Sequence, residues 1–235
     1  MFQFKQFSIR QDRCAMKVGT DGVLLGAWTP INHNPNSILD IGTGTGAIAL
    51  MLAQRTNAGQ IDALEIDENA YEQAVDNFQN SPWDNRLYCY HAGLDEFVEE
   101  PEDDYDLIAS NPPFYSEDYF SNYEKRDLAR FSISLPFEDL IQAAALLLSE
   151  AGVFSVIIPH KEEERFIALA KAQQLFPMKM TRVKGNPDVK HKRSLIAFTW
   201  KEVTNFPTDE LVIETARHQY TKEYIALTKD FYLKM

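Results

Sequence analysis

The 235-residue sequence has few cysteines, no long apolar run and a deficit of positive charge, and each shortage excludes a class of protein. Cys14 and Cys89 are too few for a disulfide framework or a cysteine metal site, so we expect two reduced thiols packed like small apolar groups. No segment approaches the roughly 20 consecutive apolar residues of a membrane helix, and the N-terminus is too charged for a signal peptide. We therefore expect a cytoplasmic protein without a membrane anchor.

The formal net charge of -12 argues against sequence-independent affinity for nucleic acid, which depends on Lys and Arg neutralising phosphates. The basic residues are unevenly distributed, however. Residues 1–17 contain Lys5, Arg10, Arg13 and Lys17 against one acid, and residues 179–193 contain six Lys and Arg residues against one acid. Local phosphate-binding patches are therefore compatible with the acidic total.

Strand-like and helix-like patterns alternate from Ser37 onward, without an internal repeat. The patterns predict strands at residues 37–42, 60–67, 85–91, 105–110, 153–159, 178–185 and 194–201, a further strand-like piece at 210–215, and helices at 47–56, 71–78, 140–148, 161–174 and 222–233. Apolar strands that alternate with helices indicate an α/β protein, with a largely parallel, Rossmann-like sheet covered by helices on both faces. We expect one domain over residues 1–235, with an N-terminal arm (1–35) packed on the core and C-terminal helix (36–235).

A glycine-rich turn follows the first of these strands, in the stretch "LDIGTGTGAIAL". In an open parallel sheet, ligands bind at the carboxyl ends of strands, and Gly42 and Gly44 lie at such an end. The letters also fit the dinucleotide pattern G-x-G-x-x-A, with Glu65 about 20 residues further on. The pattern therefore predicts a cofactor turn without identifying the cofactor.

The charge of Asp40 separates the two candidate cofactors. A pyrophosphate is an anion that Asp40 would repel, whereas S-adenosylmethionine has no phosphate and carries a cationic sulfonium and ammonium. Asp40 therefore favours S-adenosylmethionine; the alternative is a strand-end acid that only caps nearby N–H groups. We expect Glu65 to accept hydrogen bonds from the ribose and Asp67 to cap the following helix.

The stretch "SNPPF" ends another strand with an unusual set of groups for a buried segment. The amide oxygen of Asn111 and the carbonyl of Pro112 are placed to accept both N–H bonds of a planar amine, which would stabilise the positive charge of methyl transfer. The prolines restrict the backbone, and Phe114 offers a face on which a planar base stacks. The alternative is a rigid turn with an anchoring aromatic side chain.

Together, "LDIGTGTG" and "SNPPF" resemble the class I S-adenosylmethionine-dependent methyltransferases that act on planar nitrogens and carry an Asn/Asp-Pro-Pro-aromatic motif. More closely, "MKVGTDGVLLGAW", "RDLARFSISLPFEDLI" and "ALTKDFYLK" are similar to the bacterial N6-adenine methyltransferases that modify the adenine beside the anticodon of a valine tRNA. The resemblance covers nearly the whole chain. It implies S-adenosyl-L-methionine as cofactor, tRNA as substrate, and a seven-stranded sheet whose last strand is antiparallel.

The resemblance also implies further site residues. Thr20 and Asp21 are expected at the methionine end of the cofactor, although "TDG" is also an ordinary turn sequence. The acid that often holds the cofactor adenine has no direct match in "HAGLDEF", so residues 92 to 94, ending at Leu94, are expected to make this contact through the backbone.

The RNA is expected to contact basic residues near the substrate side. The candidates are Arg126, Arg130, Lys190, His191, Lys192 and Arg193, and the last four are alternatively a plain solvated loop. His191 has no metal-ligand spacing to other His or Cys residues, so no metal is expected. We expect a monomer.

Three other functions compete with transfer to N6 of adenine. A protein-glutamine or rRNA guanine-N2 methyltransferase presents a planar nitrogen to the same kind of motif. An NAD-dependent oxidoreductase needs a hydride-handling acid or base that the sequence does not place. A noncatalytic RNA-binding module predicts RNA affinity without consumption of S-adenosylmethionine.

Overall fold

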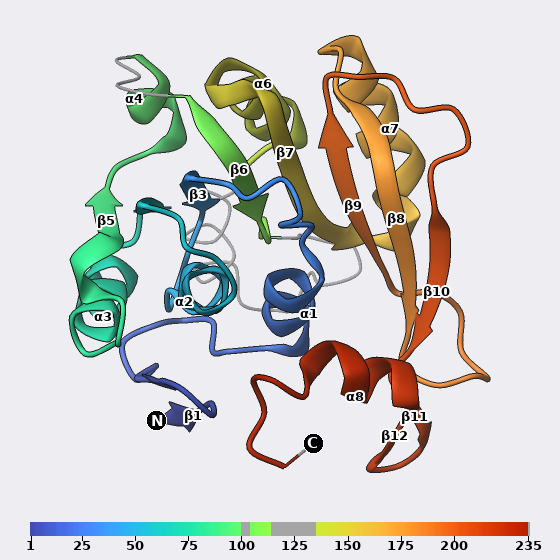
Figure 1. Ribbon diagram of the computed structural model, residues 1–235, viewed down its shortest axis with the longest axis horizontal. Coiled ribbons are helices and arrows are strands. Elements are labelled where there is room, and N and C mark those ends of the chain that lie inside the picture. The colour runs from blue at the N-terminus through green and yellow to red at the C-terminus, as the bar shows by residue number, and fades with distance from the viewer. Residues whose placement is uncertain (100–103, 114–134, 235) are drawn as a thin grey trace, which may run out of the picture.

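An eight-stranded sheet forms the centre of the computed structural model, which describes residues 1–99, 104–113 and 135–234 (Figure 1). The strand order is β10-β8-β9-β7-β6-β3-β4-β5, and β9 alone runs antiparallel to both of its neighbours, β7 and β8. The predicted Rossmann-like fold is confirmed, with one strand more than the seven expected. The bounds are β3 Ser37–Ile41, β4 Gln60–Glu65, β5 Leu87–His91, β6 Tyr105–Ser110, β7 Leu148–Pro159, β8 Phe176–Lys184, β9 Arg193–Thr199 and β10 Thr208–Val212.

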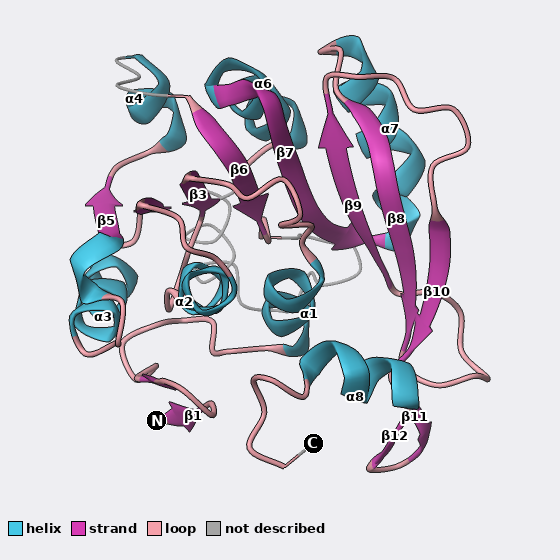
Figure 2. Ribbon diagram, viewed as in Figure 1, coloured by secondary structure: helices cyan, strands magenta, loops and turns pink. Residues whose placement is uncertain are grey.

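Helices cover both faces of this sheet, as Figure 2 shows. One face packs against α1 (Thr20–Trp28), α2 (Ala47–Arg55), α3 (Glu68–Gln79) and α8 (Lys222–Thr228), and the other against α4 (Leu94–Glu99), α6 (Phe137–Leu147) and α7 (Glu163–Ala172). Neighbouring strand residues point to opposite faces, so Ile38 belongs to the first core cluster and Leu39 to the second. The remaining short elements are β1 Phe2–Gln3, β2 Ser8–Ile9, β11 Glu214–Ala216, β12 Gln219–Tyr220, η1 Asp84–Arg86 and η3 His160–Glu162.

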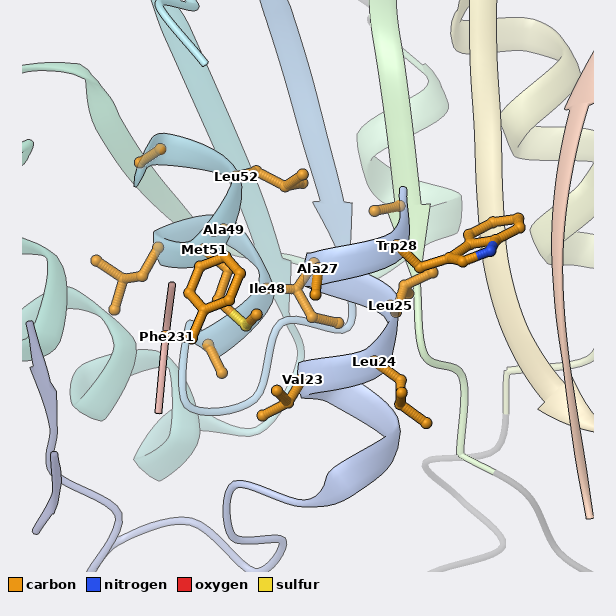
Figure 3. Packing of buried hydrophobic residues seen from close by; sticks show 14 of the residues in the cluster. Val23, Leu24, Leu25, Ala27, Trp28, Ile48, Ala49, Met51, Leu52 and Phe231 are labelled. Atoms are coloured by element: carbon orange, nitrogen blue, oxygen red, sulfur yellow. The ribbon is translucent and has the colours of Figure 1, made fainter. Parts of the chain in front are cut away.

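Helix α1 occupies the segment that the sequence analysis describes as a turn-rich arm. Its residues from Val23 to Trp28 are buried, and it packs along α2 (Figure 3). A Cβ atom at Gly26 would lie 2.8 Å from Met51 Sδ, so only glycine allows the two helices to approach this closely. Burial of six consecutive residues, on all sides of the helix, thus outweighs the low helix propensity of the two glycines in "TDGVLLGAW".

Two predicted strands differ substantially from the structure, whereas the bounds of the others agree to within two residues. The strand-like piece predicted at 210–215 is divided between β10, which pairs with β8 as the eighth strand of the sheet, and β11, which forms a hairpin with β12. β7 already begins at Leu148, so the separation predicted at Gly152 is wrong. Its pairing with β6 shifts register between Tyr105 and Leu107, and this irregularity accommodates Gly152 without ending the strand.

The two ends of the described chain pair with each other. Phe4 forms a β-bridge with Tyr232, and the Lys5 N–H donates to the Phe231 carbonyl at 2.8 Å. Phe4 and Phe231 are both buried, with their rings in edge contact. The N-terminal residues therefore belong to the same core face as α8.

Candidate active site

The parallel register of three strands brings the two predicted motifs to one place. Ile41 at the end of β3 pairs with Ser110 of β6 on one side and with Leu64 of β4 on the other. The next residue of each strand is therefore Gly42, Asn111 or Glu65, and all three lie at the same carboxyl edge. The Ser110 hydroxyl donates to the Ile41 carbonyl at 2.9 Å and fastens the ends of β3 and β6 together.

The glycine turn has a left-handed backbone at three positions. Gly42, Gly44 and Gly46 have φ values of 72°, 56° and 80°. The N–H of Gly42 donates to the Leu64 carbonyl at 3.0 Å, which holds the turn over the end of β4. A Cβ at Gly42 or Gly44 would meet nothing within 4 Å, whereas one at Gly46 would lie 2.5 Å from the Phe78 ring. The first two glycines thus border open space that a ligand can fill, and the third serves packing.

Asp40 is fully buried beneath this turn. One oxygen, Oδ2, accepts from the Thr43 hydroxyl at 2.6 Å and from the Ala49 N–H at 3.1 Å. Oδ1 is also buried and has no hydrogen-bond partner in the described part of the chain. Burial raises the pKa of Asp40 to about 7, against the lowering effect of these two hydrogen bonds. The capping role considered as an alternative is therefore present at one oxygen, while the other is buried without a hydrogen-bond partner among the described residues.

Glu65 holds the far side of the turn. Its Oε2 accepts from the Gly44 N–H at 2.8 Å, and its Oε1 accepts from the Asp67 N–H at 2.9 Å. Each carboxylate oxygen has a further lone pair, so the group can also accept from two neighbouring hydroxyls. Asp67 in turn accepts from the Ala70 N–H at 2.8 Å at the start of α3, which confirms its predicted capping role.

The loop after β5 leads into Leu94, the residue expected at the cofactor adenine, and Asp95 follows it. Leu94 begins α4 and is partly buried against the second core cluster. Asp95 Oδ1 lies 2.5 Å from the position of a Cβ on Gly93, and Ile66 Cδ1 lies 3.9 Å from it. Ile66 is 53% exposed, although it lies between two acids at the end of β4. Sequence reasoning missed Ile66, and the signal was an apolar residue between two acids at a strand end.

Asn111, Pro112 and Pro113 follow β6 directly. Pro112 is buried, and the other two are half-buried. Neither proline has an N–H to donate, so the chain leaves the sheet here with restricted φ values. The predicted site residues Phe114, Arg126 and Arg130 lie outside the described residues.

Thr20 and Asp21 begin α1 at the same edge of the sheet. The Asp21 carboxylate accepts from Arg193 Nε at 2.7 Å, at the start of β9. His191 is likewise bound to Glu210, at 2.7 Å. Two of the predicted RNA-contact residues are therefore paired with acids of the chain itself, and Lys190 and Lys192 are exposed.

The segment from Arg10 to Val18 lies beside the glycine turn and is held by α3. The buried Asn77 side chain donates to the Thr45 carbonyl in the turn and to the Arg10 carbonyl, each at 2.9 Å. Its oxygen accepts from the Arg10 N–H at 2.8 Å. Sequence reasoning missed Asn77, whose signal was an amide on the otherwise apolar face of a predicted helix.

The described residues contain neither a metal-binding cluster nor a membrane-spanning helix. No group of three or more His, Cys, Asp and Glu side chains in residues 1–99, 104–113 and 135–234 is placed to hold a metal ion. Within the same ranges, no helix has the length and apolarity needed to cross a bilayer.

Comparisons of the sequence with known proteins identify a family, and a comparison of the structure supports the fold. Residues 22–174 match the methyltransferase small domain family. A protein from Flavobacterium psychrophilum named tRNA1(Val) (adenine(37)-N6)-methyltransferase is 72% identical over 100% of both chains, and one of the same name from Bacteroides fragilis is 45% identical over 100% of this chain and 98% of its own. Among solved structures, an O-methyltransferase from Agrobacterium tumefaciens superimposes with a TM-score of 0.67 at 20% identity, covering 90% of this chain and 96% of that one.

Proposed function

The chain belongs to the tRNA1(Val) (adenine(37)-N6)-methyltransferases of the methyltransferase small domain family, and from this premise we propose that it methylates N6 of adenine 37 in the anticodon loop of a valine tRNA. The observation that carries the proposal is the register of β3, β4 and β6. It sets Asn111 beside the Gly42 turn and Glu65, so that a methyl donor in the turn and an amine at Asn111 are neighbours.

The residues present fit S-adenosyl-L-methionine, which supplies an electrophilic methyl group when bound. The open space at Gly42 and Gly44 receives the ligand, because side chains at these positions would enter it. The unpartnered Asp40 Oδ1 attracts a cationic group, and the remaining lone pairs of Glu65 accept from the ribose hydroxyls. Asp95 and Ile66 would face the adenine ring beyond Glu65.

Three further residues complete the proposed cofactor site. Thr20 and Asp21, at the start of α1, are assigned to the methionine end, where the ion pair with Arg193 holds Asp21 in position. Leu94, at the start of α4, is assigned to the adenine end.

Asn111 and Pro112 act on the amine of the target base. Hydrogen bonds from the amine to the Asn111 side-chain oxygen and the Pro112 carbonyl draw its lone pair out of conjugation with the ring. As the new C–N bond forms and the bond from methyl to sulfur breaks, the nitrogen becomes positive, and both oxygens stabilise that charge. The extra proton then leaves to water. Phe114, outside the described residues, is assigned the face on which the adenine stacks.

The adenine must leave its stack to reach this site, at a cost of a few kcal/mol that is smaller in a single-stranded loop. An anticodon loop meets this condition. Exposed Lys190 and Lys192, together with Arg126 and Arg130, are proposed to contact phosphates. That the chain works as a monomer, in the cytoplasm and without a metal, stays a prediction.

The test supplies radiolabelled methyl donor to the purified chain with total RNA and, separately, with total protein, and then identifies the modified nucleoside or amino acid. We expect the label in N6-methyladenosine of tRNA. Label in glutamine or in N2-methylguanosine would replace the proposal with one of the rival methyltransferases. An absorbance change with a nicotinamide cofactor would indicate an oxidoreductase, and RNA binding without label would indicate a noncatalytic module.

The Asn111→Ala variant tests the catalytic role within the same assay. Loss of one preorganised polar group should cost about 2–4 kcal/mol in the barrier, or roughly 30- to 800-fold in kcat, with cofactor binding retained. Asn85→Ala, which removes an exposed amide on η1, is the matched control and should keep the parental rate. Parental activity in Asn111→Ala would refute the role.

A further inference from the structure

A tyrosine-lined cavity of about 410 Å³ lies outside the glycine turn and the Asn111 motif. Of the residues assigned to the cofactor, it touches Thr20 alone. We call it the tyrosine cavity, and it is lined by Gln3, Thr20, Ile213, Glu214, Tyr220, Tyr224, Tyr232, Leu233 and Lys234. Its volume is within the range of small-molecule sites in proteins.

The cavity is built by the chain that follows β10. The β11–β12 hairpin reverses direction, and Thr221 then fastens its end, donating from N–H to the Ile213 carbonyl at 3.0 Å and from its hydroxyl to the Val212 carbonyl at 2.5 Å. The same hydroxyl caps α8 by accepting from the Tyr224 N–H at 3.1 Å. The hairpin and the start of α8 are therefore fixed as one wall.

Aromatic rings and hydrogen-bonding groups share this wall. The rings of Tyr220 and Tyr224 lie 5.3 Å apart at 36°. Tyr224 is 3% exposed, whereas Tyr220 is 38% exposed, so of these two rings Tyr220 is the one with surface available to a partner. Tyr232 is held in place by contacts with Phe2 and Phe4. A planar group that stacks on Tyr220 would have the Gln3 amide, the Glu214 carboxylate and the Lys234 ammonium among its neighbours, and this is the chemistry that recognises a nucleobase.

The tyrosine cavity opens at the edge of the sheet that carries Asn111. β10 runs parallel to β8, and beyond its end the Ile213 N–H donates to the Lys184 carbonyl at 3.0 Å. Thr20 precedes Asp21, which is paired with Arg193 beside the end of β7. Asn111 follows β6 and Ile213 follows β10, and these two strands lie four strand spacings apart, or about 20 Å along this edge. In Figure 1, α8, β11, β12 and the C-terminus lie together below the sheet.

Exposed cations surround this part of the edge. None of them forms an ion pair within the part of the chain that the structure describes: Lys17, Lys190, Lys192, Arg217, Lys222 and Lys234. The acids on the same segments without a salt-bridge partner in that part are fewer: Asp12, Asp188, Glu214, Glu223 and Asp230. The local excess of positive charge contrasts with the net charge of -12 and suits a phosphate backbone.

We propose that the tyrosine cavity binds a second base of the RNA substrate, a few nucleotides from the methylated adenine, by stacking on Tyr220. This inference rests on the proposed function and adds a site to it. It makes the loop a two-point ligand: one base enters beside Asn111, and another is held on Tyr220 while phosphates between them meet the exposed lysines.

The test compares Tyr220→Ala with Tyr220→Phe in the full chain, using an unmodified anticodon stem-loop of a valine tRNA. Removal of the ring should raise the KM for RNA by roughly 5- to 150-fold, the usual range for loss of one base–aromatic stack. Tyr220→Phe keeps the ring and should behave as the parent. The matched control is Tyr88→Ala, which removes an exposed tyrosine from β5 at the opposite edge of the sheet. An unchanged KM in Tyr220→Ala would overturn the proposal.

A series of RNAs with one abasic nucleotide each identifies the bound base. At one position, removal of the base should weaken binding of the RNA to the parent protein as much as Tyr220→Ala weakens binding of the intact RNA. The abasic RNA and the Tyr220→Ala variant together should then show no further loss of affinity. Additive losses at every position would overturn the proposal. So would a Tyr220→Ala variant that loses affinity for S-adenosylhomocysteine by the same factor, because the cavity would then belong to the cofactor.

Equilibrium RNA binding by fluorescence anisotropy separates this proposal from the proposed function. If the parent binds the stem-loop through Tyr220 but transfers no methyl group, the base-binding site stands and the methylation assignment fails. If the parent methylates adenine and Tyr220→Ala binds and reacts equally well, the methylation assignment stands and the base-binding site fails.

Discussion

The free energy of unfolding of the ligand-free Asp40→Asn variant, relative to that of the parent, should rise as the pH rises. The same substitution should weaken binding of the methyl donor. Asp40 has no exposed surface, and burial raises its pKa from 3.8 to about 7. The folded state thus holds this proton more tightly than the unfolded chain does. The contribution of Asp40 to stability is fully present below about pH 4 and is lost as the pH rises through 7.

The expected size follows from the interval between the two pKa values. One pKa unit corresponds to about 1.4 kcal/mol, and the range from pH 5 to pH 8 covers about two units of the interval. The free energy of unfolding of Asp40→Asn, relative to that of the parent, should therefore rise by about 3 kcal/mol over this range. An unpartnered amide nitrogen at the Oδ1 position costs roughly 1–3 kcal/mol, but this cost is the same at both pH values.

Urea unfolding of both proteins at pH 5, 6.5 and 8 without ligand measures this difference, with exposed Asp84→Asn as control. Titration calorimetry with S-adenosylmethionine should show parental affinity rising from pH 6 to pH 8, as the carboxylate ionises, and a weaker, pH-independent affinity in the variant. If the relative stability of the two proteins changes by less than about 0.5 kcal/mol between pH 5 and pH 8, the account of Asp40 is wrong.

Three further substitutions test other parts of the structure. Gly44→Ala places a methyl group in the open turn at positive φ. Calorimetry should show at least tenfold weaker cofactor binding, and urea unfolding should show a free energy of unfolding lower by about 1–2 kcal/mol. Unchanged cofactor affinity would contradict the assignment. Asn77→Ala should release the adjoining N-terminal segment, so limited trypsinolysis should cut at Arg10 faster than in the parent. Glu163→Gln should lower the free energy of unfolding by about 1–3 kcal/mol at pH 7, because it weakens the charged hydrogen bonds that Glu163 accepts from Arg182. These bonds outweigh burial and hold the pKa of Glu163 below its usual 4.5. The loss measured by urea unfolding should therefore shrink below that pH.

The predictable parts of the fold are those that depend on neighbouring residues in the sequence. The existence and order of the central strands, the glycine turn after β3 and the Asp67 cap follow from local rules, and the structure has them where the sequence predicts them. The proximity of Gly42 and Asn111 was predictable for a similar reason, since parallel strands bring their carboxyl ends to one edge.

The parts that escaped prediction depend on distant partners. The sequence "TDG" reads as a turn, yet it begins a helix because Gly26 lets that helix pack on Met51. The pairing of β10 with β8 depends on a register set across the whole sheet. The tyrosine cavity joins Gln3 and Thr20 to residues beyond 212, and no local pattern connects positions so far apart.

The bridge between Phe4 and Tyr232 has a consequence for the order of assembly in the cell. Protein synthesis proceeds from the N-terminus at about 5–20 residues per second, so Phe4 emerges from the ribosome more than ten seconds before its partner. Throughout that interval the aromatic side chains of residues 2 to 7 lack the surface that finally shelters them. Pairing of the N-terminal residues with Tyr232 must therefore be among the last events of folding. Until then, these aromatic side chains of the nascent chain are exposed to chaperones and to aggregation.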